Sequence, residues 1–383
     1  MPSYFEFFCG GGMVRAALDE NWTCLLANDF DHKKGESYAA NWGSDALVVD
    51  DINNISIPDL AARSNEPVDL AWASFPCQDL SLAGGGAGLR GERSGTFWPF
   101  WERMKGLAEL GLGPRIIALE NVCGTLTSHN GKDFSAIFSA FSQIGYNVGA
   151  MVVDAAKFLP QSRPRLFIIC VHKDVVIPQN IVASVPNPNW HPRALLNAHE
   201  QLEDADDKWV WWDMPSPSKR KKSLRNILDM DGADLAWHSQ QETREIISMM
   251  NETNREKLRK AKKLGKPTVG TMYRRTRYEA GIGKVQRIEV RFDGKAGCLR
   301  TPAGGSSRQL VILVDGQRVR TRLMQPLETA RLMGLTKKYT LPENFNEALH
   351  LTGDGVAVPV VQHIADTLFS PILAAATDLD IAA

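Results

Sequence analysis

A short apolar segment that ends at a Pro-Cys pair constrains the fold of this chain more than any other feature. Residues 67–74 are typical of a buried strand, and Phe75, Pro76, Cys77 and Gln78 follow directly. Proline lacks the N–H donor of a strand, so it ends the strand and fixes the turn. We therefore expect the Cys77 thiol at the carboxyl end of a sheet, where open α/β folds bind their ligands. A cysteine in that place can be a nucleophile, although most lone cysteines are small buried apolar residues.

Two other apolar runs also carry polar residues at their ends. Residues 115–119 predict a second buried strand, with Glu120 and Asn121 at its carboxyl end. Arg163 and Arg165 precede a third apolar run, and two arginines two residues apart before a strand are expected to project to the same side. Arginine keeps its proton in proteins, so it is a fixed donor for a carbonyl or a phosphate group. Each block alone is weak, but together they predict one polar site at a sheet edge.

The amino terminus predicts a ligand site built on three further strand ends. An apolar strand over residues 4–8 is followed by a glycine turn and a helix that begins near Met13. Glycines in such a turn let the backbone approach a ligand and open the amino end of a helix. The next two strands end at Asp29-Phe30 and Asp51-Ile52. An acid at the end of the second strand can bond ribose hydroxyls, and Phe30 can stack on adenine. The alternative is that Phe30 and Ile52 are core residues.

The Pro-Cys-Gln, Glu-Asn-Val and Gln-x-Arg-x-Arg blocks, in this order, resemble the signature of the DNA cytosine-5 methyltransferases of bacterial or phage type. The resemblance extends over nearly the whole chain, except the segment between about residues 174 and 295. It implies an α/β fold: a Rossmann-like methyltransferase fold with a mixed, mostly parallel sheet, plus a smaller target-recognition domain. It implies transfer of a methyl group from S-adenosylmethionine to carbon 5 of a cytosine flipped out of a specific duplex DNA sequence, leaving S-adenosylhomocysteine.

The chemistry explains why these residue types are needed. Carbon 5 of cytosine is a poor nucleophile, and addition of a thiolate to carbon 6 turns the ring into an enamine that can attack a methyl group. Cys77 is the predicted nucleophile, and Glu120 is the predicted donor to ring nitrogen 3, if burial lets its carboxyl hold a proton. The resemblance implies that Asn121 orders the Pro76-Cys77 turn, that Arg165 holds the carbonyl oxygen of the base, and that Arg163 supports Arg165 or the thiolate. The predicted catalytic residues are Pro76, Cys77, Gln78, Glu120, Asn121, Arg163 and Arg165.

Some positions depart from the pattern of the family. Glu6 stands where an Asp is usual, Met13 where a further glycine is common, and Asp29 where a Glu is usual. Asp354 replaces an Asn near the methionine end of the cofactor, and an acid there could alter cofactor affinity or identity. The predicted cofactor-binding residues are Phe8, Gly10, Gly12, Met13, Asp29, Phe30, Asp51, Ile52, Pro76, Phe97, Asp354 and Val356.

Two regions predict contacts with DNA. Residues 81–94 form a long glycine-rich stretch that the family uses as a mobile loop over the flipped base. Residues 171–300 hold 24 Lys and Arg against 17 Asp and Glu, a net charge of +7, although the whole chain has none. Such basic surface is the expected footprint of a nucleic-acid partner, although a solvated helix face could have the same charge. The predicted DNA-binding residues are Ser81, Arg90, Arg93, Gln161, Arg274, Arg275, Arg277, Arg287, Thr301, Gly304, Gly305 and Arg308.

Length and composition fit an enzyme of two domains. The 383 residues suggest a catalytic domain over 1–185 with 345–383, a target-recognition domain over 186–320, and a supporting hinge segment over 321–344, with structural charges at Glu328 and Arg331. We expect a single helix from Ser239 to Leu264 within the second domain.

Composition also sets what else is expected. Six cysteines without close pairing fit a reducing compartment, and none has the spacing of a metal site. We expect no signal peptide and no apolar run long enough to span a membrane, which is typical of a cytoplasmic protein. We also expect a monomer. A cognate restriction endonuclease that acts separately is a possible partner. Two alternatives stay open: the same chemistry on transfer RNA, or a catalytically weak DNA-binding regulator.

Overall fold

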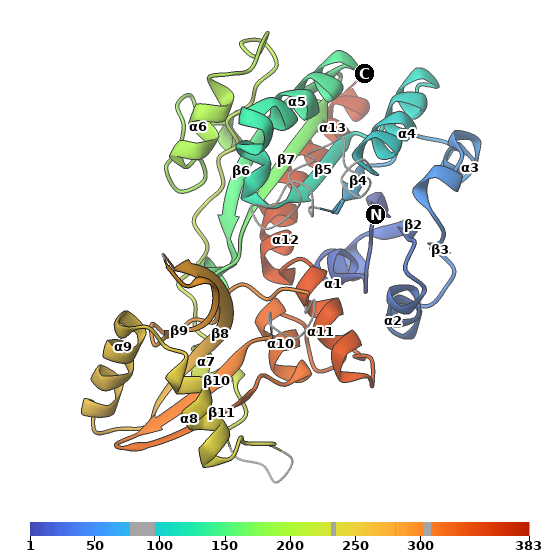
Figure 1. Cartoon of the computed structure of the whole chain (residues 1–383). Coiled ribbons are helices and arrows are strands. Elements are labelled where there is room, and N and C mark those ends of the chain that lie inside the picture. Colours follow the sequence, from blue (N-terminus) through green and yellow to red (C-terminus); the bar gives the residue numbers. More distant parts are fainter. Residues whose placement is uncertain (77–95, 231–234, 280, 302–307, 383) are drawn as a thin grey trace. The chain divides into compact units, whose positions relative to one another are not determined.

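The chain forms two compact units, which are described separately here (Figure 1). Unit 1 comprises Met1–Asp154, Pro164–Pro217 and Val360–Ala383, and unit 2 comprises Ala155–Arg163 and Ser218–Pro359. This computed structural model describes residues 1–76, 96–230, 235–279, 281–301 and 308–382.

Unit 1 is built on a seven-stranded sheet with the order β3-β2-β1-β4-β5-β7-β6. Strands β1 to β5 are parallel, whereas β7 runs antiparallel to both of its neighbours. The predicted mixed, mostly parallel sheet is therefore confirmed. The strands are β1 (Ser3–Phe7), β2 (Thr23–Asp29), β3 (Leu47–Val49), β4 (Leu70–Ala73), β5 (Ile116–Asn121), β6 (Tyr146–Asp154) and β7 (Pro164–His172).

The central strands are buried along their length because side chains pack on both faces of the sheet. Every residue of β4 and β5 is buried, as expected of a parallel sheet covered on two sides. On β1, the Phe7 ring packs edge-on against Phe100 at 5.2 Å, while the ring of Tyr4, on the opposite face, packs against Trp22 at 6.4 Å. The helices of this unit include α1 (Met13–Leu18), α2 (His32–Trp42), α3 (Ile57–Ala61), α4 (Phe97–Glu109), α5 (Lys132–Gln143), α6 (Arg193–His199) and α13 (Ser370–Ala382).

The segment that follows β7 packs on unit 1, so this unit extends to Pro217 rather than ending near residue 185. The N–H of Val148, on the edge strand β6, donates to the carbonyl of Lys208 at 2.7 Å, and Val210 N–H donates back to Val148 at 3.0 Å. Gly149 permits this approach because a Cβ there would lie 2.1 Å from the carbonyl oxygen of Val210. The stretch with Trp209, Trp211 and Trp212 therefore lies along the sheet edge and belongs to unit 1 rather than to unit 2.

Unit 2 contains a four-stranded antiparallel sheet with the order β11-β10-β8-β9. Its core joins residues of two helices to the sheet, among them Ile246, Leu258 and Ile312. Its strands are β8 (Thr268–Glu279), β9 (Gly283–Arg291), β10 (Leu310–Asp315) and β11 (Arg318–Leu323), and its helices are α7 (Leu224–Ile227), α8 (Gln240–Ser248), α9 (Glu252–Lys263), α10 (Pro326–Met333) and α11 (Phe345–Asp354).

The single helix expected from Ser239 to Leu264 is two helices. The Asn251 side chain accepts a hydrogen bond from the Asn254 N–H and begins α9, so the chain turns after α8. Asparagine favours such an N-cap because its side-chain oxygen satisfies one of the unpaired donors of the first turn. The expectation failed because the apolar pattern continued across the break.

The segment Phe345–Ala376 is long and apolar enough to cross a membrane by length and composition, with a mean hydropathy of 1.4. The expectation that no such run exists is therefore wrong for this segment. It contains α11, α12 (Val358–Ile364) and part of α13, and 56% of its most apolar window is buried inside the protein. Mostly buried core helices pass the same test, so the segment is weak evidence of a membrane span.

Candidate active site

The carboxyl ends of β4 and β5 meet at one edge of the unit 1 sheet. The two strands pair in parallel with Ala73 opposite Leu119, so Ser74 and Glu120 both follow at the same level. Pro76 is half-buried and is the last described residue before the gap. The predicted strand thus ends where the sequence places it, whereas Cys77 and Gln78 of the predicted turn lie outside the described residues.

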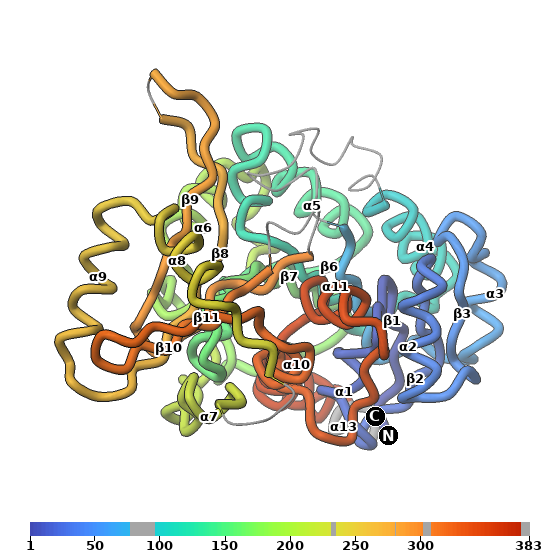
Figure 2. Tube along the Cα trace, turned by 60° about the horizontal axis from the view of Figure 1, so that its bottom comes forward, coloured from blue at the N-terminus to red at the C-terminus, as the bar shows by residue number. Residues whose placement is uncertain are grey.

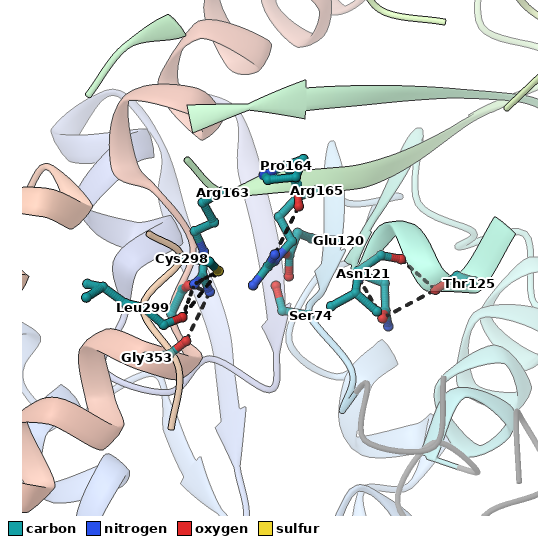
Figure 3. Close-up of polar contacts among 12 residues, drawn as sticks. Ser74, Glu120, Asn121, Thr125, Arg163, Pro164, Arg165, Cys298, Leu299 and Gly353 are labelled. Carbon is teal, nitrogen blue, oxygen red and sulfur yellow. Dashed lines mark hydrogen bonds and ion pairs between the residues drawn. The ribbon is translucent and has the colours of Figure 1, made fainter. Parts of the chain in front are cut away.

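Asn121 ties the two strand ends together. Its Nδ2 donates to the carbonyl of Phe75 at 3.1 Å, and its Oδ1 accepts from the Val122 N–H at 2.8 Å and from the Thr125 hydroxyl at 3.4 Å (Figure 3). The side chain is 4% exposed, so this amide has little competition from water. A fixed Phe75 carbonyl restricts the backbone that leads into Pro76. The sequence did not single out Thr125, and its position four residues after Asn121 was the only available signal.

Glu120 and Arg165 form an ion pair at this edge. The Nε of Arg165 lies 3.0 Å from Oε1 of Glu120, and both side chains are largely buried, at 17% and 9% exposed (Figure 3). Residue 165 reaches Glu120 because β7 runs antiparallel to β5, which brings the beginning of β7 to the end of β5. The carbonyl of Pro164 also accepts from Nη1 of Arg165 at 3.0 Å. The pair therefore presents a carboxyl group and a fixed cation side by side.

Arg163 bonds the backbone of unit 2. Its guanidinium donates to the carbonyls of Leu299 at 2.9 Å, Gly353 at 3.1 Å and Gly355 at 2.7 Å, all in unit 2 (Figure 3). The arginine is only 3% exposed. Strand β7 begins at Pro164, so the pleat that was expected to align the two arginines does not include Arg163. These contacts hold Arg163 against backbone carbonyls of unit 2, whereas Cys77, whose thiolate it was predicted to support, lies outside the described residues.

Gln161 is fully buried in unit 2, which contradicts the prediction that it contacts DNA. Its Nε2 donates to the carbonyl of Leu332 at 2.7 Å, and its Oε1 accepts from the Leu299 N–H at 3.1 Å. Both ends of the amide are used inside the protein. A glutamine beside two arginines looks like part of a polar surface in the sequence, but the tertiary contacts enclose it.

Asp29 organises the glycine turn at the carboxyl ends of β1 and β2. Its two carboxylate oxygens accept from the N–H groups of Gly10 at 2.8 Å and Asp31 at 2.9 Å. Burial raises the pKa of Asp29, while Lys34 and the two N–H donors oppose that rise. Asn28, which the sequence analysis missed although it adjoins Asp29, donates to the carbonyl of Asp50 at 2.8 Å and so fixes the end of β3.

The glycine turn itself requires glycine at residue 12. Gly12 has φ +75°, and a Cβ there would lie 2.4 Å from Nε1 of Trp42. Phe8 and Gly10 also have positive φ, of 58° and 54°. Met13 begins α1 directly after the turn and is buried.

The aromatic and apolar residues predicted for the cofactor differ in exposure. Phe30 is 67% exposed at the end of β2, so it is not a core residue, and its ring is accessible for stacking. Ile52 is 3% exposed within the core, as the alternative interpretation expected. The exposed Asp51 caps a short 3-10 helix by accepting from the Asn53 N–H at 2.8 Å. Phe97 is fully buried, with its ring 5.5 Å from that of Phe75.

Glu6 is a buried acid on β1, one strand position from the glycine turn. Burial raises the pKa of Glu6 to about 8, with a smaller rise from Asp29 and an opposing effect of Arg15. Its Oε2 has no hydrogen-bond partner among the described residues. The raised pKa favours the protonated form of the Glu6 carboxyl group near neutral pH.

The predicted residues near the carboxyl end lie in unit 2. Thr301 donates its hydroxyl hydrogen bond to Asp354, the acid that stands where the family has an Asn. Val356 is buried, and Arg308 donates from Nη2 to Oδ1 of Asn346 at 2.5 Å. Seven predicted site residues lie outside the described part of the chain: Cys77, Gln78, Ser81, Arg90, Arg93, Gly304 and Gly305.

The four arginines predicted to read DNA lie on the β8–β9 hairpin, but they are not equivalent. Arg275 and Arg277 form ion pairs with Glu289, and Arg287 pairs with Glu279 at 2.6 Å. Arg274 lines a hollow of about 600 Å³ in unit 2, together with residues of α8. Within the described ranges, no cluster of three or more His, Cys, Asp or Glu side chains could hold a metal ion.

Comparison with known proteins agrees with this arrangement. The sequence model of the C-5 cytosine-specific DNA methylases matches residues 3–370. The chain is 25% identical to the type II methyltransferase M.BsuFI of Bacillus subtilis over 97% of this chain and 74% of that protein. It is 23% identical to the type II methyltransferase M.HhaI of Haemophilus parahaemolyticus over 96% and 94% of the two chains. The fold is similar to that of S. pombe Dnmt2 methyltransferase, with a TM-score of 0.62, 16% identity, and coverage of 97% and 99%. The chain belongs to the C-5 cytosine-specific DNA methylase family and is an S-adenosylmethionine-dependent enzyme that methylates cytosine in DNA.

Proposed function

We propose that this enzyme transfers a methyl group to carbon 5 of a cytosine flipped out of a specific duplex sequence, through a covalent adduct between Cys77 and carbon 6. The observation that carries the proposal is the Glu120–Arg165 ion pair, 3.0 Å apart and largely buried at the edge of the sheet where the Phe75-Pro76 turn ends. The Asn121 bond to Phe75 supports it, because it restrains the backbone one residue before Pro76.

Each residue has a defined part in the proposed reaction. The Cys77 thiolate forms a bond to carbon 6, and the electron pair of the 5,6 double bond moves into the ring, where Glu120 gives a proton to nitrogen 3. Arg165 holds the ring carbonyl oxygen as charge develops there. Carbon 5 then takes the methyl group. A base removes the proton at carbon 5, the electron pair of that bond restores the 5,6 double bond, and the carbon–sulfur bond breaks to return the Cys77 thiolate, while nitrogen 3 gives its proton back to Glu120. Cytosine inside a stacked duplex is out of reach of such a site, so the base must be flipped.

S-adenosylmethionine supplies the electrophilic methyl group, and the residues present fit its binding. The exposed Phe30 ring fits stacking on adenine, and the exposed Asp51 fits polar contacts at the neighbouring strand end. Asp29 has two accepting positions left after its two backbone bonds, since a carboxylate offers about four. Gly12 keeps the turn free of a Cβ that would collide with Trp42. Asp354 accepts a hydrogen bond from Thr301. We therefore propose that the carboxylate of Asp354 stabilises this contact within unit 2 and does not change which cofactor binds.

The partners and setting follow from the same proposal. The basic segment 171–300 supports a double-stranded DNA partner. The relatives named type II methyltransferases support a link to a restriction endonuclease that acts separately, in a bacterial or phage cytoplasm. We further propose that the enzyme acts as a monomer without a metal ion, and that residues 218–320 of unit 2 supply most DNA recognition.

The experiment is mass spectrometry of nucleosides from duplex DNA incubated with the protein and S-adenosylmethionine. The expected result is 5-methylcytosine with the wild type, none with Cys77→Ala, and a rate lower by about 10²- to 10⁴-fold with Glu120→Gln. Methyl transfer to RNA alone would replace DNA as the substrate. Near-normal turnover by Glu120→Gln would remove the proposed role of this acid.

A second measurement tests the covalent adduct directly. DNA that carries 5-fluorocytosine should trap the enzyme in a complex stable to denaturant, because fluorine cannot leave carbon 5 as a proton does. Cys123→Ala is the matched control: this thiol lies three residues after Glu120, and burial raises its pKa. Trapping that survives Cys77→Ala but fails with Cys123→Ala would refute the assignment of the nucleophile.

A further inference from the structure

The β8–β9 hairpin of unit 2 is a long two-stranded ribbon with two different faces. Its strands pair from Thr271 opposite Arg291 to Glu279 opposite Gly283. Side chains alternate between the faces, and directly opposed residues share a face. Figure 2 shows the outer part of this hairpin extending past the helices α8 and α9.

On one face of the outer ribbon, the arginines form ion pairs with glutamates of the same hairpin. Arg275 lies opposite Arg287, and like charges in that position repel each other. Glu289 and Glu279 offset the repulsion, since Glu289 pairs with Arg275 at 3.4 Å and Glu279 accepts from Nε of Arg287 at 2.7 Å. Arg277 is also held by Glu289. These arginines therefore already have carboxylate partners.

The opposite face is exposed. Its own side chains include two cations and no carboxylate, and Arg274 lines the hollow of unit 2 together with Glu242 and Glu245 of α8. We call the hairpin residues of this face the ribbon face: Arg274, Thr276, Tyr278, Lys284 and Gln286. Tyr278 is 80% exposed, although a tyrosine usually buries much of its ring.

The direction of the ribbon face is fixed by the core at the base of the hairpin. Met272, Ile288 and Val290 lie on the same side of the ribbon as Arg274 and are buried against α8 and α9. A slip of one residue would move these apolar side chains to solvent, so the register is strongly specified. The alternation then places Arg274 on the side of the ribbon that α8 and α9 cover at its base, beside the hollow of unit 2, and Arg275 on the paired face.

The dimensions and residue types of this face fit the major groove of DNA. The β8 side of the ribbon face spans residues 274–278, five strand positions of about 3.3 Å each, which give about 17 Å. The major groove is about 12 Å wide and admits a two-stranded ribbon. Arginine bonds guanine, glutamine bonds adenine, and threonine or an aromatic ring contacts the methyl group of thymine. Phosphate contacts alone would not require this mixture.

We propose that the ribbon face reads base edges in the major groove and that Arg274 and Gln286 determine sequence specificity, whereas Arg275, Arg277 and Arg287 hold the ribbon in shape. This inference rests on the proposed function, because it names residues that choose the DNA site. It revises the sequence prediction, which treated all four arginines of the hairpin alike.

The test selects bound duplexes from a random-sequence DNA library and, separately, maps methylated cytosines on the same library. Arg274→Ala and Gln286→Ala should each lose discrimination at a base pair, by roughly 5- to 150-fold against single-base variants of the site. Arg275→Ala is the matched control, since it removes the same charge from the next residue on the opposite face. It should keep the selected sequence and lower the thermal stability of the protein.

Two results would overturn the inference. If both ribbon-face variants keep the wild-type sequence while affinity falls uniformly and the salt dependence weakens, these residues contact phosphates only. If Arg275→Ala changes the selected sequence, the faces are wrongly assigned. Selection of bound DNA does not depend on methyl transfer. Sequence-selective binding without any 5-methylcytosine would therefore refute the proposed function, and the selected sequences would still test the role of the ribbon face.

Discussion

Unit 2 depends on a buried ion pair between Arg322 and Glu328, and loss of the carboxylate should destabilise this unit alone. Both side chains are fully buried. The guanidinium donates to the two oxygens of Glu328 at 2.8 and 2.6 Å, a bidentate geometry. The carboxylate also accepts from the N–H groups of Asp229 at 2.8 Å and Gln325 at 2.7 Å. Four donors thus converge on one side chain.

Glu328→Gln removes the charge while keeping the shape of the side chain. The Arg322 cation then stays buried without its counter-ion, and at least one donor faces the amide NH₂ group. Breaking a buried pair in this way costs about 3–5 kcal/mol. The cost falls on unit 2 because the partners, Asp229, Arg322 and Gln325, all belong to it.

Hydrogen exchange measured peptide by peptide is the suitable assay, since a protein of two units does not unfold in one step. Protection in β10 should fall by roughly two to four orders of magnitude, as follows from about 1.4 kcal/mol per factor of ten. Protection in β5 of unit 1 should stay close to the wild type.

Two further variants test whether the loss of protection in Glu328→Gln comes from the buried cation that is left without a counter-ion. Arg322→Met combined with Glu328→Leu should recover much of the lost protection, because apolar residues can replace a buried pair. Glu252→Gln removes one partner from an exposed pair with Arg259 and should change little. A loss below tenfold in Glu328→Gln, or an equal loss in β5, would refute the reasoning.

Three further changes concern unit 1. Glu6→Gln should remove a dependence of stability on pH. The pKa of Glu6, about 8, lies above its ordinary 4.5, so the contribution of Glu6 to stability is complete below pH 4.5 and is lost as the pH rises to 8. The variant should therefore be thermally more stable than the wild type at pH 9 but not at pH 4. Gly12→Ala should weaken S-adenosylmethionine binding in calorimetry by more than Gly10→Ala, because both strain a positive φ but only the first meets another side chain. Asn121→Ala leaves the Phe75 carbonyl without its donor and should slow 5-fluorocytosine trapping by about tenfold or more, with cofactor affinity retained.

The sequence predicted the sheet of unit 1 well because each strand carries its own signal. Buried parallel strands are continuous apolar runs, and polar residues at their carboxyl ends collect at one edge. Glu120 and Asn121 therefore lie beside the Phe75-Pro76 turn, as the order of the blocks implied. The second unit was less predictable, since the break at Asn251 interrupts a continuous helical pattern.

Contacts between distant segments account for the predictions that failed. Gln161 is enclosed by Leu299 and Leu332, more than a hundred residues away, and nothing in its neighbourhood of the sequence indicates this. Arg274 and Arg275 are adjacent residues of the same type, so the sequence alone does not distinguish their roles. In the structure, Arg275 is ion-paired, and the position of the hairpin core shows that it lies on the other face from Arg274.

Arg163 and Arg165 lie on either side of the point where the chain passes from unit 2 to unit 1. Arg165 pairs with Glu120 in unit 1, whereas Arg163 holds three carbonyls in unit 2, and the chain passes between the units at this point. Because two peptide bonds separate the α-carbons of these residues, they cannot move apart by more than about 7 Å. The two arginines of this short motif thus serve different purposes: the one we propose for Arg165 is catalytic, and that of Arg163 is structural. Replacement of Arg163 should therefore disturb the loops at Leu299 and Gly353 before it disturbs any chemical step.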